Sequence, residues 1–181
     1  AASDVYKRQL QYTLKILLNS IYGTFANKHS SLMDIDHATS ITVTGQNVSK
    51  AGGHIIDNFV KAKYGVDRSV TKYGDTDSLY ISIDPILKKH NIPLLVDGEV
   101  NPKVHEIVDK IDKHVNTEIL EWARKDLFSI DPRYVFKREV ISDVGIFLQK
   151  KRYILHVLDE EGVAVDKFKY TGIELARSTT P

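Results

Sequence analysis

The chain has 181 residues, about the size of one domain. Of these residues, 42% are hydrophobic and 27% charged, which is typical of a globular protein. No apolar run approaches the ~20 residues of a membrane-spanning helix, so we expect no membrane partner. The absence of cysteine excludes disulfides and thiolate zinc sites, so the natural metals are hard cations with oxygen ligands. The net charge of +1 does not by itself indicate a nucleic-acid-binding domain.

The two ends of the sequence indicate a fragment. The chain begins with Ala1, carries its single methionine at Met33 and stops at Pro181. Residues 1–9 lack a clear apolar period, so we interpret them as a non-native leader and leave them out of the fold prediction.

Apolar residues at helical spacing predict two helices in the first third of the chain. The first covers residues 10–26, with a stripe of leucine and isoleucine along one side, and the second covers residues 36–64. Gly52 and Gly53 each weaken the second helix by about 1 kcal/mol. Close helix packing would explain their presence.

The pattern then changes to short strands around one long helix. Residues 69–73 and 79–83 are predicted to pair as a β-hairpin, because apolar and polar side chains alternate in the second run. A proline-containing loop spans residues 85–102, and an amphipathic helix covers residues 104–122. Further strands are predicted over residues 134–141, 152–158 and 163–170, the last two as a hairpin. This order predicts an α+β fold, with an antiparallel sheet and helices packed on one of its faces.

Two carboxylates, Asp75 and Asp77, lie two residues apart at the tip of the first hairpin. At ~6 Å separation they would repel each other by about 3 kcal/mol at an effective dielectric of about 20. Magnesium removes this cost, because it takes one or two carboxylates and completes its octahedron with waters and substrate phosphates. Gly74 would let a nucleotide or another backbone come close. The alternative is an ordinary turn, where Asp and Gly are common for conformational reasons.

Three polar residues of the first helix, Lys15, Asn19 and Tyr22, are spaced by four and three positions and therefore share one face. The lysine can neutralise a phosphate, the asparagine can hydrogen-bond a phosphate or sugar, and the tyrosine can pack on a base pair that Gly23 allows to approach. These residues suit a nucleoside triphosphate. Taken alone, they are explained better by a solvated polar face on a core helix.

Two strings of residues resemble motifs of the family B DNA polymerases. Residues 73–80, YGDTDSLY, are similar to the palm carboxylate motif of that family, and residues 15–23, KILLNSIYG, are similar to its K-x-x-x-N-S-x-Y-G fingers motif. Their order along the chain is also that of the family. The resemblance, to the tailed-phage branch in particular, covers nearly everything after Gln9.

The resemblance implies a division of the chain into parts of a polymerase. Residues 10–27 would be the C-terminal fingers helix, residues 28–174 the palm with an RRM-like antiparallel sheet, and residues 175–181 the start of the palm-to-thumb junction. The family's other palm motif, D-x-x-S-L-Y-P-S, supplies a second metal-binding aspartate and does not occur in this sequence. The chain is therefore expected to be inactive in isolation.

The resemblance also assigns residues near the C-terminal end. Lys150, Lys151, Arg152 and Tyr153 are similar to the K-K-R-Y element with which these polymerases hold the primer terminus, although a cluster of cations is usually a solvated face. Glu139 matches an acidic palm residue near the metals in relatives. The alternative for Glu139 is a surface glutamate paired with a neighbouring base.

The function implied by the resemblance is template-directed DNA synthesis, in which two Mg²⁺ ions assist transfer of a deoxynucleotide to a primer 3′ end. The catalytic residues would be Asp75, Asp77 and Glu139, with the two aspartates as metal ligands. Implied partners are primer-template DNA, deoxynucleoside triphosphates and a processivity clamp, and the expected location is the cytoplasm, that of the host cell if the protein is viral.

Two alternatives stay open at this point. Another two-metal nucleotidyl enzyme, such as a nucleotide cyclase, would not require Lys15, Asn19 and Tyr22. A noncatalytic nucleic-acid-binding module would use exposed aromatic and cationic side chains on an RRM-like sheet, where Asp75 and Asp77 would repel a polyanion unless metal were present.

Overall fold

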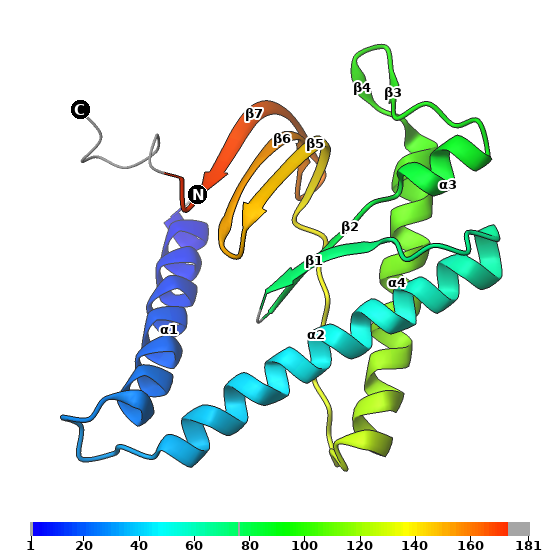
Figure 1. Ribbon diagram of the computed structural model, residues 1–181. Coiled ribbons are helices and arrows are strands. Elements are labelled where there is room, and N and C mark those ends of the chain that lie inside the picture. The colour runs from blue at the N-terminus through cyan, green and yellow to red at the C-terminus, as the bar shows by residue number, and fades with distance from the viewer. Residues whose placement is uncertain (1, 76, 174–181) are drawn as a thin grey trace. The chain divides into compact units, whose positions relative to one another are not determined.

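The computed structural model describes residues 2–75 and 77–173, and the chain forms two compact units, Ala1–Gln46 and Asn47–Pro181. None of the described helices is long and apolar enough to cross a bilayer. Helices and antiparallel strands both build the described chain (Figure 1), which confirms the α+β class. The elements are α1 (Ala2–Ala26), α2 (Ile35–Tyr64), β1 (Thr71–Asp75), β2 (Ser78–Ile81), α3 (Asp84–Lys89), β3 (Leu95–Val96), β4 (Glu99–Val100), α4 (Pro102–Asp126), β5 (Val140–Gln149), β6 (Arg152–Glu160) and β7 (Val163–Thr171).

The first unit consists of α1, a short loop and the start of α2. Helix α1 begins at Ala2, so residues 2–9, which we had left out of the fold prediction, continue the helix. They contain no glycine or proline, and helix propensity extends a helix even where the apolar period is missing. At the start of α2, the Asp34 carboxylate accepts a hydrogen bond of 3.0 Å from the backbone N–H of His37 and so caps the helix.

The glycine pair of α2 lies in the second unit, at a close approach to other segments. A Cβ on Gly52 would lie 2.6 Å from the Phe136 ring and 3.3 Å from Leu79, and a Cβ on Gly53 would lie 3.4 Å from Thr71. The close packing expected around these glycines is therefore present. The neighbours are the β1–β2 hairpin and the segment before β5, rather than another helix.

A core of aliphatic side chains joins α2, α4 and the hairpin in the second unit. Ile56 and Val60 of α2 share this core with buried residues of α4, and the alternating residues of the hairpin, Leu79 and Ile81, pack against it as predicted. Asn101 caps the start of α4, because its side chain accepts a hydrogen bond of 3.0 Å from the N–H of Lys103, and Pro102 begins the first turn. The buried α4 residues in this core are Val104, Ile107, Val108, Ile111 and Val115.

The region predicted as a loop holds short elements as well. Helix α3 occupies Asp84–Lys89 and buries Pro85, Ile86 and Leu87, and β3 and β4 form a small hairpin after it. The loop prediction was wrong here because Pro85 was taken as a breaker. In the first turn of a helix proline removes no hydrogen bond, since the N–H there has no partner in the helix.

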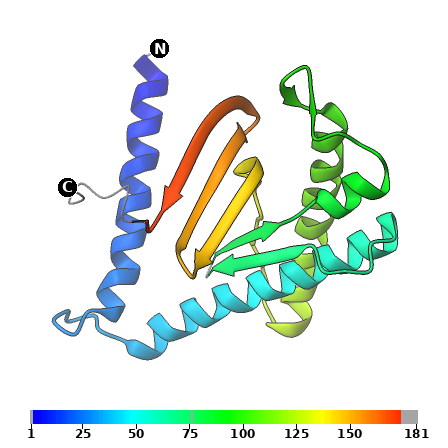
Figure 2. The same ribbon diagram turned by 45° about the horizontal axis from the view of Figure 1, so that its top comes forward.

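Within residues 2–75 and 77–173, the strands pair antiparallel in three sheets, β1–β2, β3–β4 and β5–β6–β7, rather than in one. Figure 2 shows β6 between β5 and β7. The strand predicted over residues 134–141 was wrong, because β5 begins only at Val140. The preceding segment runs past α4, where the Asn116 side chain accepts from the N–H of Phe136 at 2.7 Å and donates to its carbonyl at 2.8 Å. A side chain thus takes the place of a neighbouring strand. The hairpin over residues 152–158 and 163–170 is confirmed as β6–β7.

Candidate functional site

The acidic turn, Asp75 and Asp77, joins β1 to β2. Cα partners along the hairpin are Tyr73 with Tyr80 and Asp75 with Ser78. Leu79 faces the glycines of α2, so alternation along the strands places Tyr80 on the opposite face. Asp75, two residues after Tyr73, shares the face of the two tyrosines. Asp75 is half-buried and Asp77 is exposed.

The basic turn, Lys150 and Lys151, joins β5 to β6, and both lysines are exposed. Lys151 has a φ of 62°, in the left-handed region. Its backbone N–H donates a hydrogen bond of 2.8 Å to the hydroxyl of Tyr73. On the other side, Gly172 lies so close that a Cβ there would overlap the carbonyl oxygen of Lys151. The backbone of the basic turn is therefore held from both sides.

Four rings, which we call the aromatic block, fill the space between the two hairpins. Phe147 lies 5.1 Å from Tyr73 and 5.2 Å from Tyr80, centroid to centroid, and Tyr153 lies 5.3 Å from Tyr80. The Tyr80 hydroxyl donates a hydrogen bond of 2.7 Å to the hydroxyl of Tyr153. Burial raises the pKa of Tyr80 well above its ordinary value, and the hydrogen bond to Tyr153 and the charge of Glu139 add to the rise. Tyr80 is therefore a dependable donor.

Glu139 lies just before β5, exposed and close enough to Tyr80 to influence its pKa. Its neighbouring bases have other partners: Lys137 pairs with Glu161 at 2.7 Å, and Arg138 with the buried Asp159. The pairing of Glu139 with a neighbouring base, the alternative considered from the sequence, therefore does not occur between these side chains. The second unit thus gathers the acidic turn, the basic turn and Glu139 around one aromatic block.

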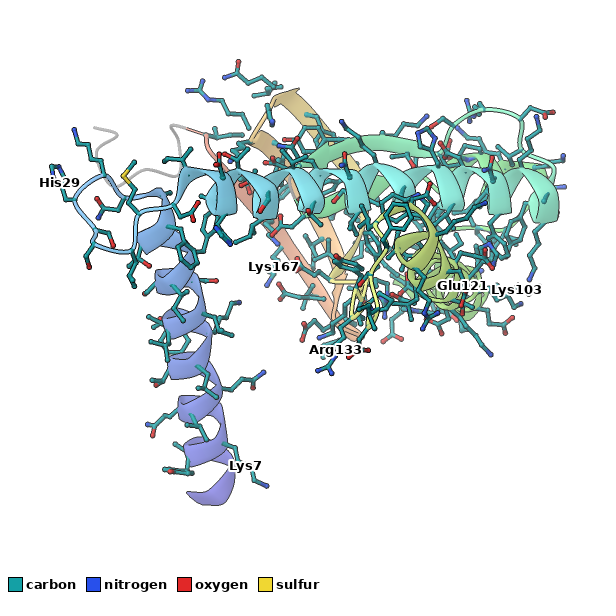
Figure 3. The ribbon with its side chains drawn as sticks, turned by 90° about the horizontal axis from the view of Figure 1, so that it is seen from below. Lys7, His29, Lys103, Glu121, Arg133 and Lys167 are labelled. Carbon is teal, nitrogen blue, oxygen red and sulfur yellow. The ribbon has the colours of Figure 1, made fainter. Side chains whose placement is uncertain are left out.

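Lys15, Asn19, Tyr22 and Gly23 lie in α1, in the first unit, and all four residues are exposed. The Tyr22 hydroxyl is hydrogen-bonded to the hydroxyl of Thr42 at 2.9 Å. A Cβ on Gly23 would meet no other atom within 4 Å, so packing in the described chain gives no reason for a glycine. Figure 3 shows side chains extending from α1 on several sides, with Lys7 in its early turns and His29 in the loop that follows.

The acidic turn carries two carboxylates, which are of the ligand type that magnesium prefers. Across residues 2–75 and 77–173, no three His, Asp or Glu side chains gather in a way that could hold a metal by themselves. Magnesium seldom needs such a cage, because one or two carboxylates, waters and substrate phosphates complete its shell. Asp75 and Asp77 supply the carboxylates that this chemistry requires.

Of the residues that join the two turns, Lys151 and Tyr153 were predicted from the sequence as site residues, whereas Tyr73, Tyr80 and Phe147 were not. Strand alternation in YGDTDSLY was a usable signal, since it places Tyr73 and Tyr80 on the face of Asp75. Phe147 gave no such signal, because its approach to Tyr73 depends on the pairing of two hairpins far apart in the sequence.

The chain is similar to viral DNA polymerases. It is 30% identical over 198 residues to the DNA-directed DNA polymerase of Escherichia phage RB69, covering 99% of this chain and 21% of that protein. The DNA-directed DNA polymerase of Enterobacteria phage T4 is 31% identical over 186 residues, covering 94% of this chain and 20% of that protein. The DNA polymerase beta of African swine fever virus (isolate Pig/Portugal/Lis 60/1960) is 33% identical over 157 residues, covering 81% of this chain and 12% of that protein.

The chain spans about a fifth of the length of these phage relatives. The match to the family is nevertheless continuous, because residues 2–180 correspond to DNA polymerase family B. The motifs at the two turns and on α1 all fall inside this match. The chain therefore belongs to DNA polymerase family B.

Proposed function

We propose that the complete protein carrying this chain is a DNA-directed DNA polymerase that adds deoxynucleotides to a primer 3′ end. The observation that carries the proposal is the hydrogen bond from Lys151 to Tyr73, which links the basic turn to the hairpin that carries the acidic turn. A site for phosphoryl transfer to DNA needs carboxylates for metal ions beside cations for the primer. Family membership supports this reaction over that of a nucleotide cyclase.

In the proposed site, Asp75 and Asp77 are the metal ligands, and Glu139, near Tyr80, is the further acidic catalytic residue. When bound, two Mg²⁺ ions would activate the primer hydroxyl and stabilise the departing pyrophosphate. Lys150 and Lys151 neutralise primer phosphates, with Arg152 and Tyr153 completing the contact at the start of β6. The half-buried position of Asp75 keeps its carboxylate near the aromatic face of the hairpin.

The face of α1 is proposed to receive the incoming deoxynucleoside triphosphate. Lys15 and Asn19 stabilise charge on the phosphates, and Tyr22 packs on the nascent base pair next to Gly23. The exposure of these side chains and the open space around Gly23 support this role. We assign residues 10–27 to the fingers and residues 28–174 to the palm. The junction proposed for residues 175–181 lies outside the described residues.

Primer-template DNA is the proposed macromolecular substrate. A processivity clamp is the proposed accessory partner, and the cytoplasm of the host cell the proposed site of action. The second metal-binding aspartate of the family has no counterpart motif in this sequence. We therefore expect the isolated chain to show no primer extension, or only a trace.

The test is Asp77→Asn in the complete polymerase. Removing one carboxylate charge at the metal should abolish primer extension, while the dissociation constant for primer-template DNA should change by less than about threefold, because the basic turn is untouched. Extension is measured on a labelled primer and binding by fluorescence anisotropy. Asp97→Asn, at the β3–β4 turn, is the matched control. An active Asp77→Asn enzyme would refute the metal assignment.

A further inference from the structure

Two tyrosines on one side of the β1–β2 hairpin hold the neighbouring β5–β6 hairpin by their hydroxyl groups. Tyr73 and Tyr80 are cross-strand partners. The Tyr73 hydroxyl accepts from the N–H of Lys151 at 2.8 Å, and the Tyr80 hydroxyl donates to the hydroxyl of Tyr153 at 2.7 Å. Two adjacent residues of one hairpin thus grip two nearby residues of the other.

One of these contacts is made by Lys151, the residue of the basic turn whose backbone conformation is unfavourable. Lys151 has left-handed backbone geometry, with a φ of 62°, which is disfavoured for a residue that carries a Cβ. Its N–H is taken by Tyr73, and its carbonyl lies against Gly172, where a larger residue would overlap it. Such a residue keeps an unfavourable conformation only where its surroundings determine it.

The rings alone would bring the hairpins together, but hydroxyl groups add direction. Phe147 contacts Tyr73 at 5.1 Å and Tyr80 at 5.2 Å, centroid to centroid, and it has no hydroxyl. A hydrophobic contact tolerates sliding, whereas a hydrogen bond weakens steeply once distance or angle departs from its optimum. Two hydroxyl bonds at neighbouring positions therefore fix the offset between the hairpins.

We propose that Tyr73 and Tyr80 are positioning residues that set the distance between the acidic turn and the basic turn. This inference rests on the proposed function, in which one turn holds metal ions and the other holds the primer terminus. Under that function, the spacing decides whether the primer hydroxyl meets the activated phosphate. A misplacement of ~1 Å can cost ~100-fold in rate, so the two hydroxyls matter for turnover more than for DNA binding.

The structural half of the proposal is tested by amide hydrogen exchange on the full 181-residue chain. Tyr73→Phe should keep the ring packing and speed exchange of the Lys151 amide by about fivefold, as expected for loss of one neutral hydrogen bond. Tyr170→Phe makes the same change on β7, on the opposite face of its sheet, and should leave Lys151 unchanged. Unchanged Lys151 exchange in Tyr73→Phe would overturn the contact on which the proposal stands.

The functional half is tested by single-turnover incorporation in the complete polymerase. Tyr73→Phe and Tyr80→Phe should each lower the incorporation rate by about tenfold or more, with less than about a threefold change in the dissociation constant for primer-template DNA, because the lysine side chains remain. If the two hydroxyl groups had a merely structural role, each substitution would slow incorporation and weaken DNA binding together, or would change neither. Rates equal to wild type, despite faster Lys151 exchange, would overturn the positioning role and leave the proposed function intact. A wild-type enzyme that cannot extend primers would instead overturn the proposed function.

Discussion

Helix α1 and the pair of turns in the second unit carry equally specific sequence motifs but differ in how the structure supports them. The site residues of α1 are exposed along a helix whose apolar residue Leu18 is itself 67% exposed. The acidic and basic turns, in contrast, are tied by a hydrogen bond between Tyr73 and Lys151 and by the aromatic block. Local helix geometry places Lys15 and Asn19, and one hydrogen bond to Thr42 adds to it at Tyr22, whereas several long-range contacts place the residues of the turns.

Because the two regions are held differently, substitutions in them should affect different properties of the protein. A residue placed by local helix geometry can change without disturbing its neighbours, so its mutations report directly on ligand contacts. A residue of the turns is coupled to several others, so its mutations combine effects on stability and on chemistry. The two regions therefore need different experiments. Pairs of matched substitutions, one in each region, distinguish how the residues of each region are held.

The largest expected difference is between Ile111→Ala and Leu18→Ala. Ile111 is 1% exposed in the core of the second unit, so truncation should lower the free energy of unfolding by about 2–5 kcal/mol. Leu18→Ala removes a largely exposed side chain and should stay within about 0.5 kcal/mol. Urea unfolding followed by the fluorescence of Trp122, the chain's single tryptophan, gives the value for Ile111→Ala, and urea unfolding followed by circular dichroism of the helices gives the value for Leu18→Ala. A cost for Leu18→Ala near that of Ile111→Ala would contradict the contrast.

The next comparison is between two glycine-to-alanine substitutions, whose effects on stability should have opposite signs. Gly172 has a φ of 63° and no room for a Cβ beside Lys151, so Gly172→Ala should destabilise the second unit by about 1–3 kcal/mol. Gly23 lies in a helix with open space around it, so Gly23→Ala should stabilise α1 by about 0.5–1 kcal/mol.

Urea unfolding followed by Trp122 fluorescence measures the effect at Gly172, and helix content by circular dichroism measures the effect at Gly23. Gly98→Ala is the control for backbone conformation, since Gly98 has a φ of 85° but open surroundings. A Gly172→Ala cost equal to that of Gly98→Ala would show that the clash with Lys151 is absent.

The sequence was sufficient for the parts of the fold that depend on local pattern. The long helices, the β1–β2 hairpin and the β6–β7 hairpin were all predicted, because their apolar periods and turn residues lie within each segment. The alternation of Leu79 and Ile81 also predicted correctly which side chains would meet the core.

Errors arose where a distant residue decides the local structure. Residues 134–139 alternate like a strand, but Asn116 on α4 takes their backbone hydrogen bonds at Phe136. The same limit applies to the site. The motif residues were recognisable, while the roles of Tyr73 and Phe147 depend on two hairpins that meet only in the folded chain.

The smallest expected effect distinguishes the two regions by pH. In the second unit, His156 on β6 bonds Asp143 on β5 at 2.7 Å and Asp166 on β7 at 2.8 Å, through its two ring nitrogens. In the first unit, Asp34 caps α2 and accepts from His37. The hydrogen bond to Asp166, and then that to Asp143, raises the pKa of His156, whereas the backbone hydrogen bond from His37 lowers the pKa of Asp34.

The two shifts predict opposite pH dependences. A raised histidine pKa gives stability that is complete below the unfolded value of about 6.5 and is lost as pH rises through the folded value. The stability difference between wild type and His156→Gln should therefore shrink from about pH 6 to pH 8. The difference for Asp34→Asn should instead shrink in acid, as pH falls through the lowered pKa. Urea midpoints measured across pH test both, and a flat His156→Gln difference would mean that the imidazole is not charged between its two carboxylates.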